Sequence, residues 1–227
     1  SIVDFTVKDK AADQKDLLWA NATNKTNGTV TFNFAHALSR LGYTVKLSGN
    51  YNSSDATFTL KKITLAGSST DATKGAFYTS GTIDLSKQNK KGDLWSDQTG
   101  RQYFDWFSGE YKVTSSTASH PGSDIEKNKD YLFVIPQKFK TGTDKLYVIV
   151  EYTIHYEDNG KEQTNKVYKQ LTNNKKFEQG KAYMINLTLG LPIEFDVDVT
   201  GDINAGVDGW GTDEHINIGS NDNPWER

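Results

Sequence analysis

The stretch Leu-Tyr-Val-Ile-Val-Glu-Tyr-Thr-Ile-His-Tyr at residues 146–156 decides the fold class. Apolar side chains occupy every second position from Leu146 to Tyr156, and this period of two predicts a β-strand with a buried face. The turn sequence Asp158-Asn159-Gly160 follows directly and predicts a hairpin to a second strand through Val167 and Tyr168.

The same alternation recurs along the chain and predicts an all-β fold, an antiparallel β-sandwich. Lys61 and Lys62 interrupt it by a shift of phase, which predicts a β-bulge. Helical periodicity is limited to about one turn at 36–40 and a second short turn within 13–20. Residues 86–130 alternate weakly and are expected to form a long loop insertion with short strands near 83–85 and 111–113. The other alternating segments are Val30–Phe34, Tyr43–Leu47, Phe58–Leu65, Tyr183–Leu189 and Ile193–Val199.

Composition excludes several classes of protein. The chain has 227 residues and no cysteine, so it has no disulfide scaffold, thiolate metal site or cysteine nucleophile. A formal net charge of −3 argues against a nucleic-acid-binding domain. No apolar run approaches the ~18 residues of a membrane-spanning helix.

The charge is divided unevenly between the body and the end of the chain. Residues 193–227 contain nine acidic residues and one basic residue, whereas the rest of the chain carries a net positive charge. Residues 201–227 are rich in glycine, asparagine and aspartate, and are expected to form an acidic tail. An acidic end on a mildly basic body permits two interpretations, a solvated surface or a contact with a partner.

Motifs for catalysis or cofactor binding are missing, so we expect no enzyme activity, no cofactor and no metal. The four histidines do not occur in a metal-ligand spacing, and no nucleophile elbow is present. His36 continues an apolar face and is interpreted as a hydrogen-bonded, partly buried histidine. The segment from Asp202 resembles a calcium loop but has Val207 where the loop requires glycine.

Two groups of side chains keep alternative functions open. Glu194, Asp196 and Asp198 are predicted on one strand face, as a solvated row or as the acid and base of a glycoside hydrolase. A second group is aromatic and either covers one end of the sandwich or stacks on sugars or a protein partner. Its candidate binding residues are Trp95, Tyr103, Trp106 and Phe107.

The order of several motifs resembles that of the Bacteroidales fimbrillins. The most typical is Gly-Lys-Ala-Tyr-Met-Ile-Asn-Leu-Thr-Leu at 180–189, before a last alternating strand. Asp-Leu-Leu-Trp-Ala at 16–20 opens the resemblance, which covers most of 16–199. The further matching segments are 29–39, 43–47, 75–78, 81–85, 131–137 and 146–152.

The resemblance implies transthyretin-like sandwiches in a lipoprotein exported to the outer-membrane surface, a non-catalytic subunit of a fimbrium or its tip adhesin. It leaves open the stalk, tip and anchor roles. Few residues precede the motif at 16–20, so residues 1–40 are expected to be the end of an N-terminal sandwich domain. Residues 41–200 then form the C-terminal sandwich domain, and residues 201–227 the tail.

The resemblance also implies assembly with other fimbrial subunits, in which a strand of one subunit fills a groove in the next. The candidate strand-exchange residues are Ile2, Phe5, Val7, Ile193, Phe195, Val197, Val199, Ile216 and Ile218. Host or bacterial surface glycans or proteins are further possible partners, and a surface carbohydrate-binding module is the alternative function.

Overall fold

The computed structural model describes residues 2–20, 34–49, 51, 55–86, 94–121, 130–139, 144–171 and 176–204, with backbone only for 201–204. Its elements are strands apart from two short 3-10 turns, so the predicted all-β class is confirmed. In chain order they are β1 (Ile2–Thr6), η1 (Ala11–Asp13), β2 (Leu18–Trp19), β3 (Ala35–His36), β4 (Ser39–Leu47), β5 (Ala56–Ala66), β6 (Ser80–Asp84), β7 (Trp95–Thr99), β8 (Phe104–Val113), β9 (Leu132–Val134), β10 (Gln137–Lys138), β11 (Tyr147–Tyr156), β12 (Glu162–Gln170), β13 (Lys176–Phe177), β14 (Lys181–Leu189), η2 (Pro192–Glu194) and β15 (Asp196–Asn204).

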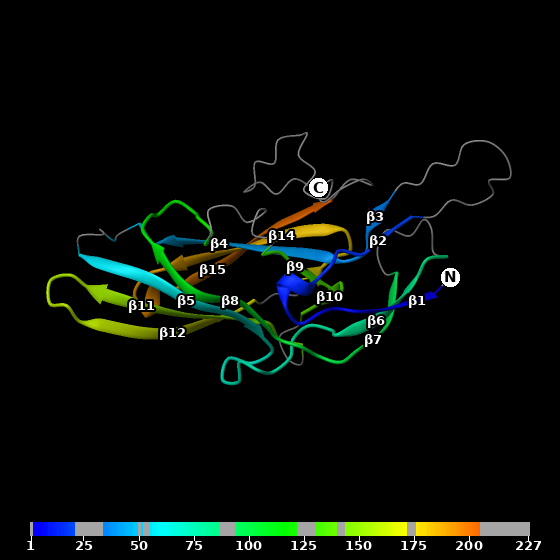
Figure 1. The fold of residues 1–227 in the computed structure, drawn as a ribbon, viewed down its shortest axis with the longest axis horizontal. Helices are drawn as coiled ribbons and strands as arrows, with labels where there is room; N and C mark the ends of the chain where they lie inside the picture. Colours follow the sequence, from blue (N-terminus) through cyan, green and yellow to red (C-terminus); the bar gives the residue numbers. More distant parts are fainter. Residues whose placement is uncertain are drawn as a thin grey trace.

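Two four-stranded sheets form the layers of the sandwich (Figure 1). One has the order β12-β11-β5-β8 and is antiparallel throughout, and the other has the order β15-β14-β4-β9. In the second sheet β14 runs parallel to β4, which departs from the expected antiparallel arrangement. The long chain segment between these two strands supplies the crossover that parallel pairing requires.

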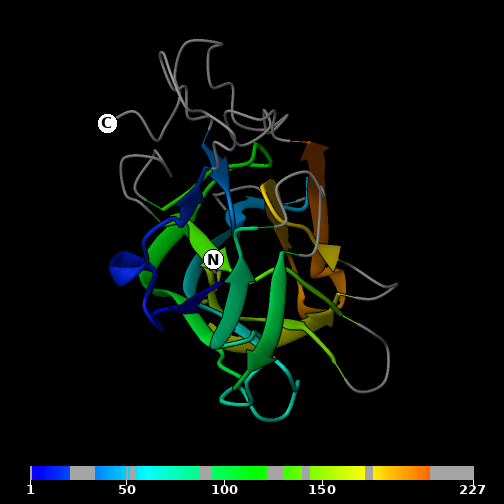
Figure 2. The ribbon, with the colours of Figure 1, turned by 90° about the vertical axis from the view of Figure 1, so that its right-hand side faces the viewer.

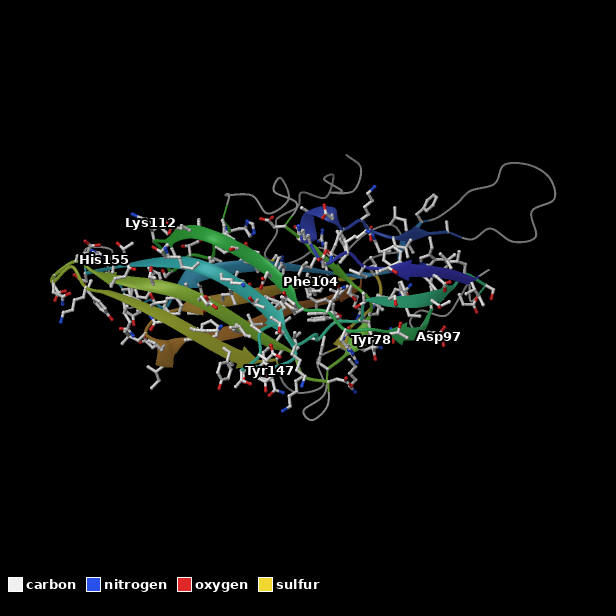
Figure 3. The ribbon with its side chains drawn as sticks, turned by 60° about the horizontal axis from the view of Figure 1, so that its bottom comes forward. Tyr78, Asp97, Phe104, Lys112, Tyr147 and His155 are labelled. Atoms are coloured by element: carbon white, nitrogen blue, oxygen red, sulfur yellow. The ribbon has the colours of Figure 1, made fainter. Side chains whose placement is uncertain are left out.

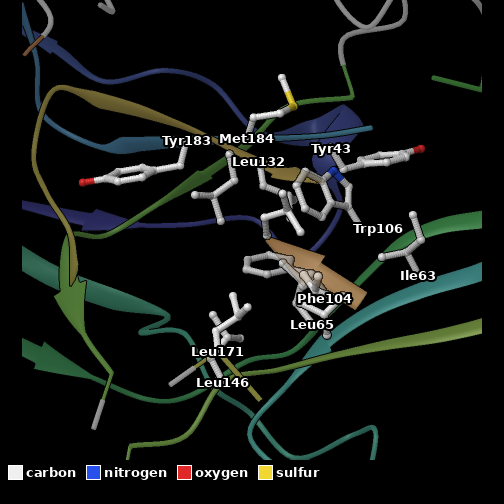
Figure 4. Packing of buried hydrophobic residues seen from close by; sticks show 14 of the residues in the cluster. Tyr43, Ile63, Leu65, Phe104, Trp106, Leu132, Leu146, Leu171, Tyr183 and Met184 are labelled. Atoms are coloured by element: carbon white, nitrogen blue, oxygen red, sulfur yellow. The ribbon is translucent and has the colours of Figure 1, made fainter. Parts of the chain in front are cut away.

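The core lies between the two sheets. Tyr43 of β4 packs its ring edge-to-face on Trp106 of β8, with centroids 4.9 Å apart, which joins the layers (Figure 4). Tyr152 of β11 joins them again, because its hydroxyl donates to the carbonyl oxygen of Gly190 at 2.8 Å. The alternating apolar residues of β4, β5, β11 and β14 fill the space between, as their period of two predicted.

Two local predictions on β5 and β11 are confirmed. The pairing of β5 with both neighbours shifts at Lys61, so the bulge occurs at the predicted phase change. The hairpin β11–β12 turns through 158–160, where Gly160 has a φ of 65° and its N–H donates to the carbonyl oxygen of Tyr156. Glycine adopts this left-handed conformation without the steric cost of a side chain.

A smaller three-stranded sheet, β1-β6-β7, closes one end of the sandwich (Figure 2). Asp97 of β7 lies at this end, whereas His155, next to the β11–β12 hairpin, lies at the opposite end (Figure 3). Trp95 of β7 attaches the small sheet to the main core, because its indole N–H donates to the carbonyl oxygen of Ala37 at 2.6 Å. The two-stranded pairs β2-β3 and β10-β13 complete the fold.

Three sequence-based expectations need correction. Residues 36–40 form no helical turn, because Ser39–Leu47 pairs with β14 and β9, and tertiary pairing overrides the weak local preference. The last alternating strand begins at Asp196, since Pro192 starts the turn η2. The stretch 86–130 contains β8, which pairs with β5 in a main sheet.

The expected domain boundary between residues 40 and 41 falls inside β4. On its N-terminal side, Val7, Ala37 and Leu38 belong to the same hydrophobic cluster as the strands of the sandwich. The small sheet likewise pairs β1 with β6, which lies far along the chain. Within the described residues, the segments 2–20 and 34–40 therefore pack as part of one core.

The buried hydroxyl of Tyr152 is expected to make the folded protein less stable at alkaline pH. Burial is the largest cause that raises the pKa of its hydroxyl, to about 12. A tyrosine in the unfolded chain ionises near pH 10, so from about pH 10 to 12 the unfolded chain holds fewer protons. The free energy of unfolding then falls by about 1.4 kcal/mol per pH unit from this group. Urea titrations at about pH 9 and 11 measure how much free energy of unfolding each variant loses between these two pH values. The loss should be smaller for Tyr152→Phe than for Tyr168→Phe, which changes an exposed tyrosine and serves as the control. Equal losses in the two variants would contradict the prediction.

Candidate assembly surface

The free edges of the sheets are the candidate site, because an unpaired strand edge presents N–H and carbonyl groups to an incoming strand. In the described residues the large sheets end at β12, β8, β15 and β9, and the small sheet ends at β1 and β7. These edges differ in how they are protected. The difference indicates which of them another chain can pair with.

An ion pair and a loop protect the edges of the large sheets at β12, at β15 and on the β9 side. Lys169 of β12 forms an ion pair with Asp196 of β15, and this contact links the two edge strands on one side of the sandwich. Beyond the short β9, the edge of β4 is covered by the loop at 115–119, where Val45 N–H donates to the carbonyl oxygen of Ser119 at 2.8 Å. Edge charges and covering loops are features that disfavour pairing with another chain.

Strand β1 is one of the two outer strands of the small sheet, and it pairs with β6 alone. Ile2 is 72% exposed, whereas Phe5 packs edge-to-face on Trp95 with centroids 6.1 Å apart. Val7 follows the strand and is buried, and its N–H donates to the carbonyl oxygen of Thr79 at 2.9 Å. β1 thus combines an exposed backbone edge with two side chains that fill positions in the core.

The C-terminal strand-exchange candidates are spread over two elements. Ile193 lies in η2 and is 92% exposed, whereas Phe195 packs against the core just before β15. Val197 is buried and Val199 partly buried, so the body of β15 serves as a core strand of this molecule. Ile216 and Ile218 lie outside the described residues.

The four aromatic candidates do not form a common exposed platform. Trp95 and Trp106 are 8% and 7% exposed, and their indole N–H groups donate to the carbonyl oxygens of Ala37 and Asp130. Phe107 packs partly against the core, and Tyr103 is half-buried. Both tryptophans therefore use their polar atom inside the fold and are largely buried. An aromatic-rich segment has the same sequence signal in a core and in a surface cluster.

The acidic candidates that follow β14 form hydrogen bonds and an ion pair within the fold. Glu194 lies in η2, so it does not share a strand face with Asp196 and Asp198 as expected. The hydroxyl of Tyr51 donates to the carboxylate of Glu194 and lowers its pKa, with help from the N–H of Leu191. Lys169 is the main cause that lowers the pKa of Asp196. Neither carboxyl has the raised pKa that suits a general acid.

His36 has the structural role predicted for it. Its side chain is 5% exposed, and its Nδ1 lies 2.5 Å from Oδ2 of Asp16, which is 8% exposed. No sequence signal marks Asp16 as the partner of His36, because the two residues are far apart in the chain. Among the residues placed by the structure, no group of three or more histidine, aspartate or glutamate side chains has a metal-binding arrangement.

Comparison with known proteins defines the class. The chain matches the family model described as fimbrillin-like over residues 1–210, so it belongs to the fimbrillin-like family. The resemblance seen in the sequence is thereby confirmed.

Solved structures similar to the chain include three, each described as a "putative cell adhesion protein". They come from Bacteroides uniformis (17% identity, TM-score 0.45), Bacteroides ovatus (16%, 0.41) and Parabacteroides distasonis (8%, 0.45). The alignments cover 88%, 94% and 74% of this chain, and 65%, 62% and 52% of those structures. The chain thus spans less than two thirds of their length, and likenesses of this size carry no argument about its function.

No curated protein matches the chain. In the part of the chain that the structure describes, no helix has the length and apolar character needed to cross a membrane.

Proposed function

We propose that the protein is a non-catalytic fimbrial subunit or tip adhesin on the bacterial outer-membrane surface, and that it assembles with other subunits by exchange of a β-strand. Family membership supports the fimbrial role. The proposal includes a transthyretin-like arrangement of the sandwich and export as a lipoprotein. These two points rest on the family resemblance alone.

The observation that carries the exchange is the position of β1. Four of its five side chains are exposed and only Phe5 is partly buried, so few contacts hold the strand. Segments with few buried contacts open at a small cost in free energy. Its departure would leave the edge of β6 unpaired and the ring of Trp95 without Phe5. A strand of another copy with the same alternation can then occupy that edge.

A disulfide staple tests this exchange in the full chain. Asp4 lies opposite Thr82, whose hydroxyl donates to its carboxylate at 3.1 Å. The bond from Val7 N–H to Thr79 makes Asp4 and Thr82 a non-hydrogen-bonded pair, in which the side chains stand closest. The chain has no cysteine of its own, so Asp4→Cys with Thr82→Cys gives a single disulfide. Light scattering measures assembly. Under conditions in which the wild-type chain assembles, the oxidised variant is expected to stay monomeric. Reduction of the disulfide is expected to restore its assembly.

The matched control is His155→Cys with Glu162→Cys, which joins β11 to β12 at an antiparallel pair beside their hairpin turn. This staple does not involve β1, and oxidised protein is expected to assemble like the wild type. A peptide with residues 2–7 should compete with assembly of the wild-type chain. Assembly of the β1-stapled protein at the wild-type level, with no effect of the peptide, would overturn exchange at β1.

A further inference from the structure

The turn between β11 and β12 contains the dipeptide Asn159-Gly160, whose chemistry needs no enzyme. An asparagine before a glycine deamidates when the glycine nitrogen attacks the side-chain carbonyl carbon, because no side chain on the glycine obstructs the ring that forms. In the described residues, Asn159 is the one asparagine that precedes a glycine, and a second such pair at 27–28 lies outside them. Asn159 and Gly160 are both exposed, so water reaches the turn directly.

The side chain of Asn159 is turned toward the backbone that follows it. Its Oδ1 accepts a hydrogen bond from the N–H of Lys161 at 2.9 Å. This Asx turn closes a ring that includes the nitrogen of Gly160, so Cγ of Asn159 lies on the side of the attacking atom. A Cβ built on Gly160 would meet no atom within 4 Å, which leaves the reacting atoms unobstructed.

The same N–H of Lys161 favours the reaction electrostatically. Attack on Cγ of Asn159 moves negative charge onto Oδ1, which is the atom to which this N–H donates. A backbone donor held at the atom where charge develops lowers the barrier to such an addition. The turn therefore both orients and polarises the carbonyl group that is attacked.

One hydrogen bond of the hairpin opposes the attack. The N–H of Gly160 donates to the carbonyl oxygen of Tyr156 at 2.9 Å, and this bond must open before the nitrogen can react. The N–H of Tyr156 donates in turn to the carbonyl oxygen of Lys161 at 2.8 Å, which closes the end of the hairpin. Exposed hydrogen bonds at a turn open at a small cost in free energy. The pairing of β11 with β12 thus controls how often the nitrogen is available.

We propose that Asn159-Gly160 is a site of spontaneous deamidation, with water as the only co-reactant, and that the pairing of β11 with β12 sets its rate. The nitrogen of Gly160 gives its proton to water and forms a bond to Cγ of Asn159, while the side-chain NH2 group takes up a proton and leaves as ammonia. Water then opens the cyclic imide at either carbonyl, which leaves aspartate or isoaspartate at position 159. This reaction is independent of the proposed fimbrial function.

Either product changes the tip of the hairpin. Both add a carboxylate to a turn where Asp55, Glu157 and Asp158 already line one surface hollow, so like charges gather there. Isoaspartate also carries the main chain through Cγ and lengthens the turn by one methylene. The N–H of Tyr156, which donates across the end of the hairpin to Lys161, is therefore expected to exchange faster in the isoaspartate form.

Ageing of the folded full chain in mildly alkaline, heavy-oxygen water tests the site. Trypsin releases residues 146–161 as one peptide, and its mass should show an amide replaced by a carboxyl group with one heavy oxygen. An isoaspartyl methyltransferase reagent should label part of this peptide. The peptide at 162–166 contains Asn165, which is 5% exposed and precedes a lysine, and it should stay unmodified. Asn159→Gln should abolish the change at 146–161, because glutamine would have to close a larger ring.

The staple His155→Cys with Glu162→Cys tests the control by strand pairing, since residue 155 lies beside this turn (Figure 3). Its oxidised form should convert Asn159 several-fold more slowly than its reduced form, whereas oxidation of the β1 staple should have no effect.

Three results would overturn the proposal. Asn159 could stay unmodified in the folded chain while a synthetic peptide of residues 155–163 reacts, which would show that the fold blocks the site. Aspartate without isoaspartate would exclude attack by the nitrogen of Gly160. Equal rates in the oxidised and reduced forms of the hairpin staple would contradict control by strand pairing.

Discussion

Phe77→Ala is expected to lower the free energy of unfolding by about 3–5 kcal/mol, the usual cost of removing a fully buried phenylalanine ring. Phe77 is completely buried, and its ring contacts Phe104 and Phe139 with centroids 5.2 and 5.4 Å away. It also stacks at 6.5 Å on Phe177. The substitution removes the centre of this aromatic cluster. The rings around it come from separate segments of the chain, which cannot close the cavity without moving backbone.

Phe34→Ala is the matched control, because Phe34 is 54% exposed and should change stability by less than about 0.5 kcal/mol. Urea unfolding, followed by tryptophan fluorescence, measures the free energy of unfolding of both variants. The slope of this free energy against urea concentration is expected to be similar in the two. A loss below about 1 kcal/mol for Phe77→Ala would show that the cluster repacks around the missing ring.

Gly75→Ala is expected to cost about 3 kcal/mol, through overpacking against backbone. A Cβ at Gly75 would lie 2.5 Å from the carbonyl carbon and 2.6 Å from the carbonyl oxygen of Arg101. The neighbouring N–H groups of Ala76 and Phe77 donate to the carbonyl oxygen of Gln102, so the two segments cannot separate without breaking these bonds. Arg101 also places its guanidinium 3.7 Å from the ring centre of Tyr78, which holds the segments together from the surface.

Gly49→Ala is the control for Gly75→Ala, since a Cβ at Gly49 meets no atom within 4 Å. This variant should be neutral or gain a few tenths of a kcal/mol, because alanine restricts the unfolded chain. Thermal and urea unfolding of the two alanine variants compare them directly. Similar stabilities would mean that the loop before β6 moves away from Arg101 easily.

Much of the sandwich is predictable from local sequence. The period of two at 146–156, the glycine turn at 158–160 and the phase change at Lys61 correspond to a strand, a hairpin and a bulge in the structure. These features depend on neighbours in the chain, whose side chains alternate between the faces of a strand regardless of the partner. Pro192 opens the turn η2 and so marks the break before β15.

The candidate site was less predictable, because it depends on which strands become edges. Ile2, Phe5 and Val7 were candidates because they are apolar residues of an N-terminal segment suited to strand exchange, and the structure adds that β1 is an exposed edge of a small sheet. The concentration of aromatic residues selected Trp95 and Trp106, whose indole groups turn inward to the carbonyl oxygens of Ala37 and Asp130. An aromatic residue has the same sequence signal in a core and on a binding surface, and only its neighbours in space separate the two.

The sequence by itself determined the class of the protein, its all-β character and its place among fimbrillin-like chains, because strand periodicity and motif order are local properties. The tertiary structure decided the parallel pairing of β4 with β14, the contact of Gly75 with Arg101, and the bond between Asp16 and His36. These contacts join residues far apart in the chain, and their energies exist only after the loops between them have closed.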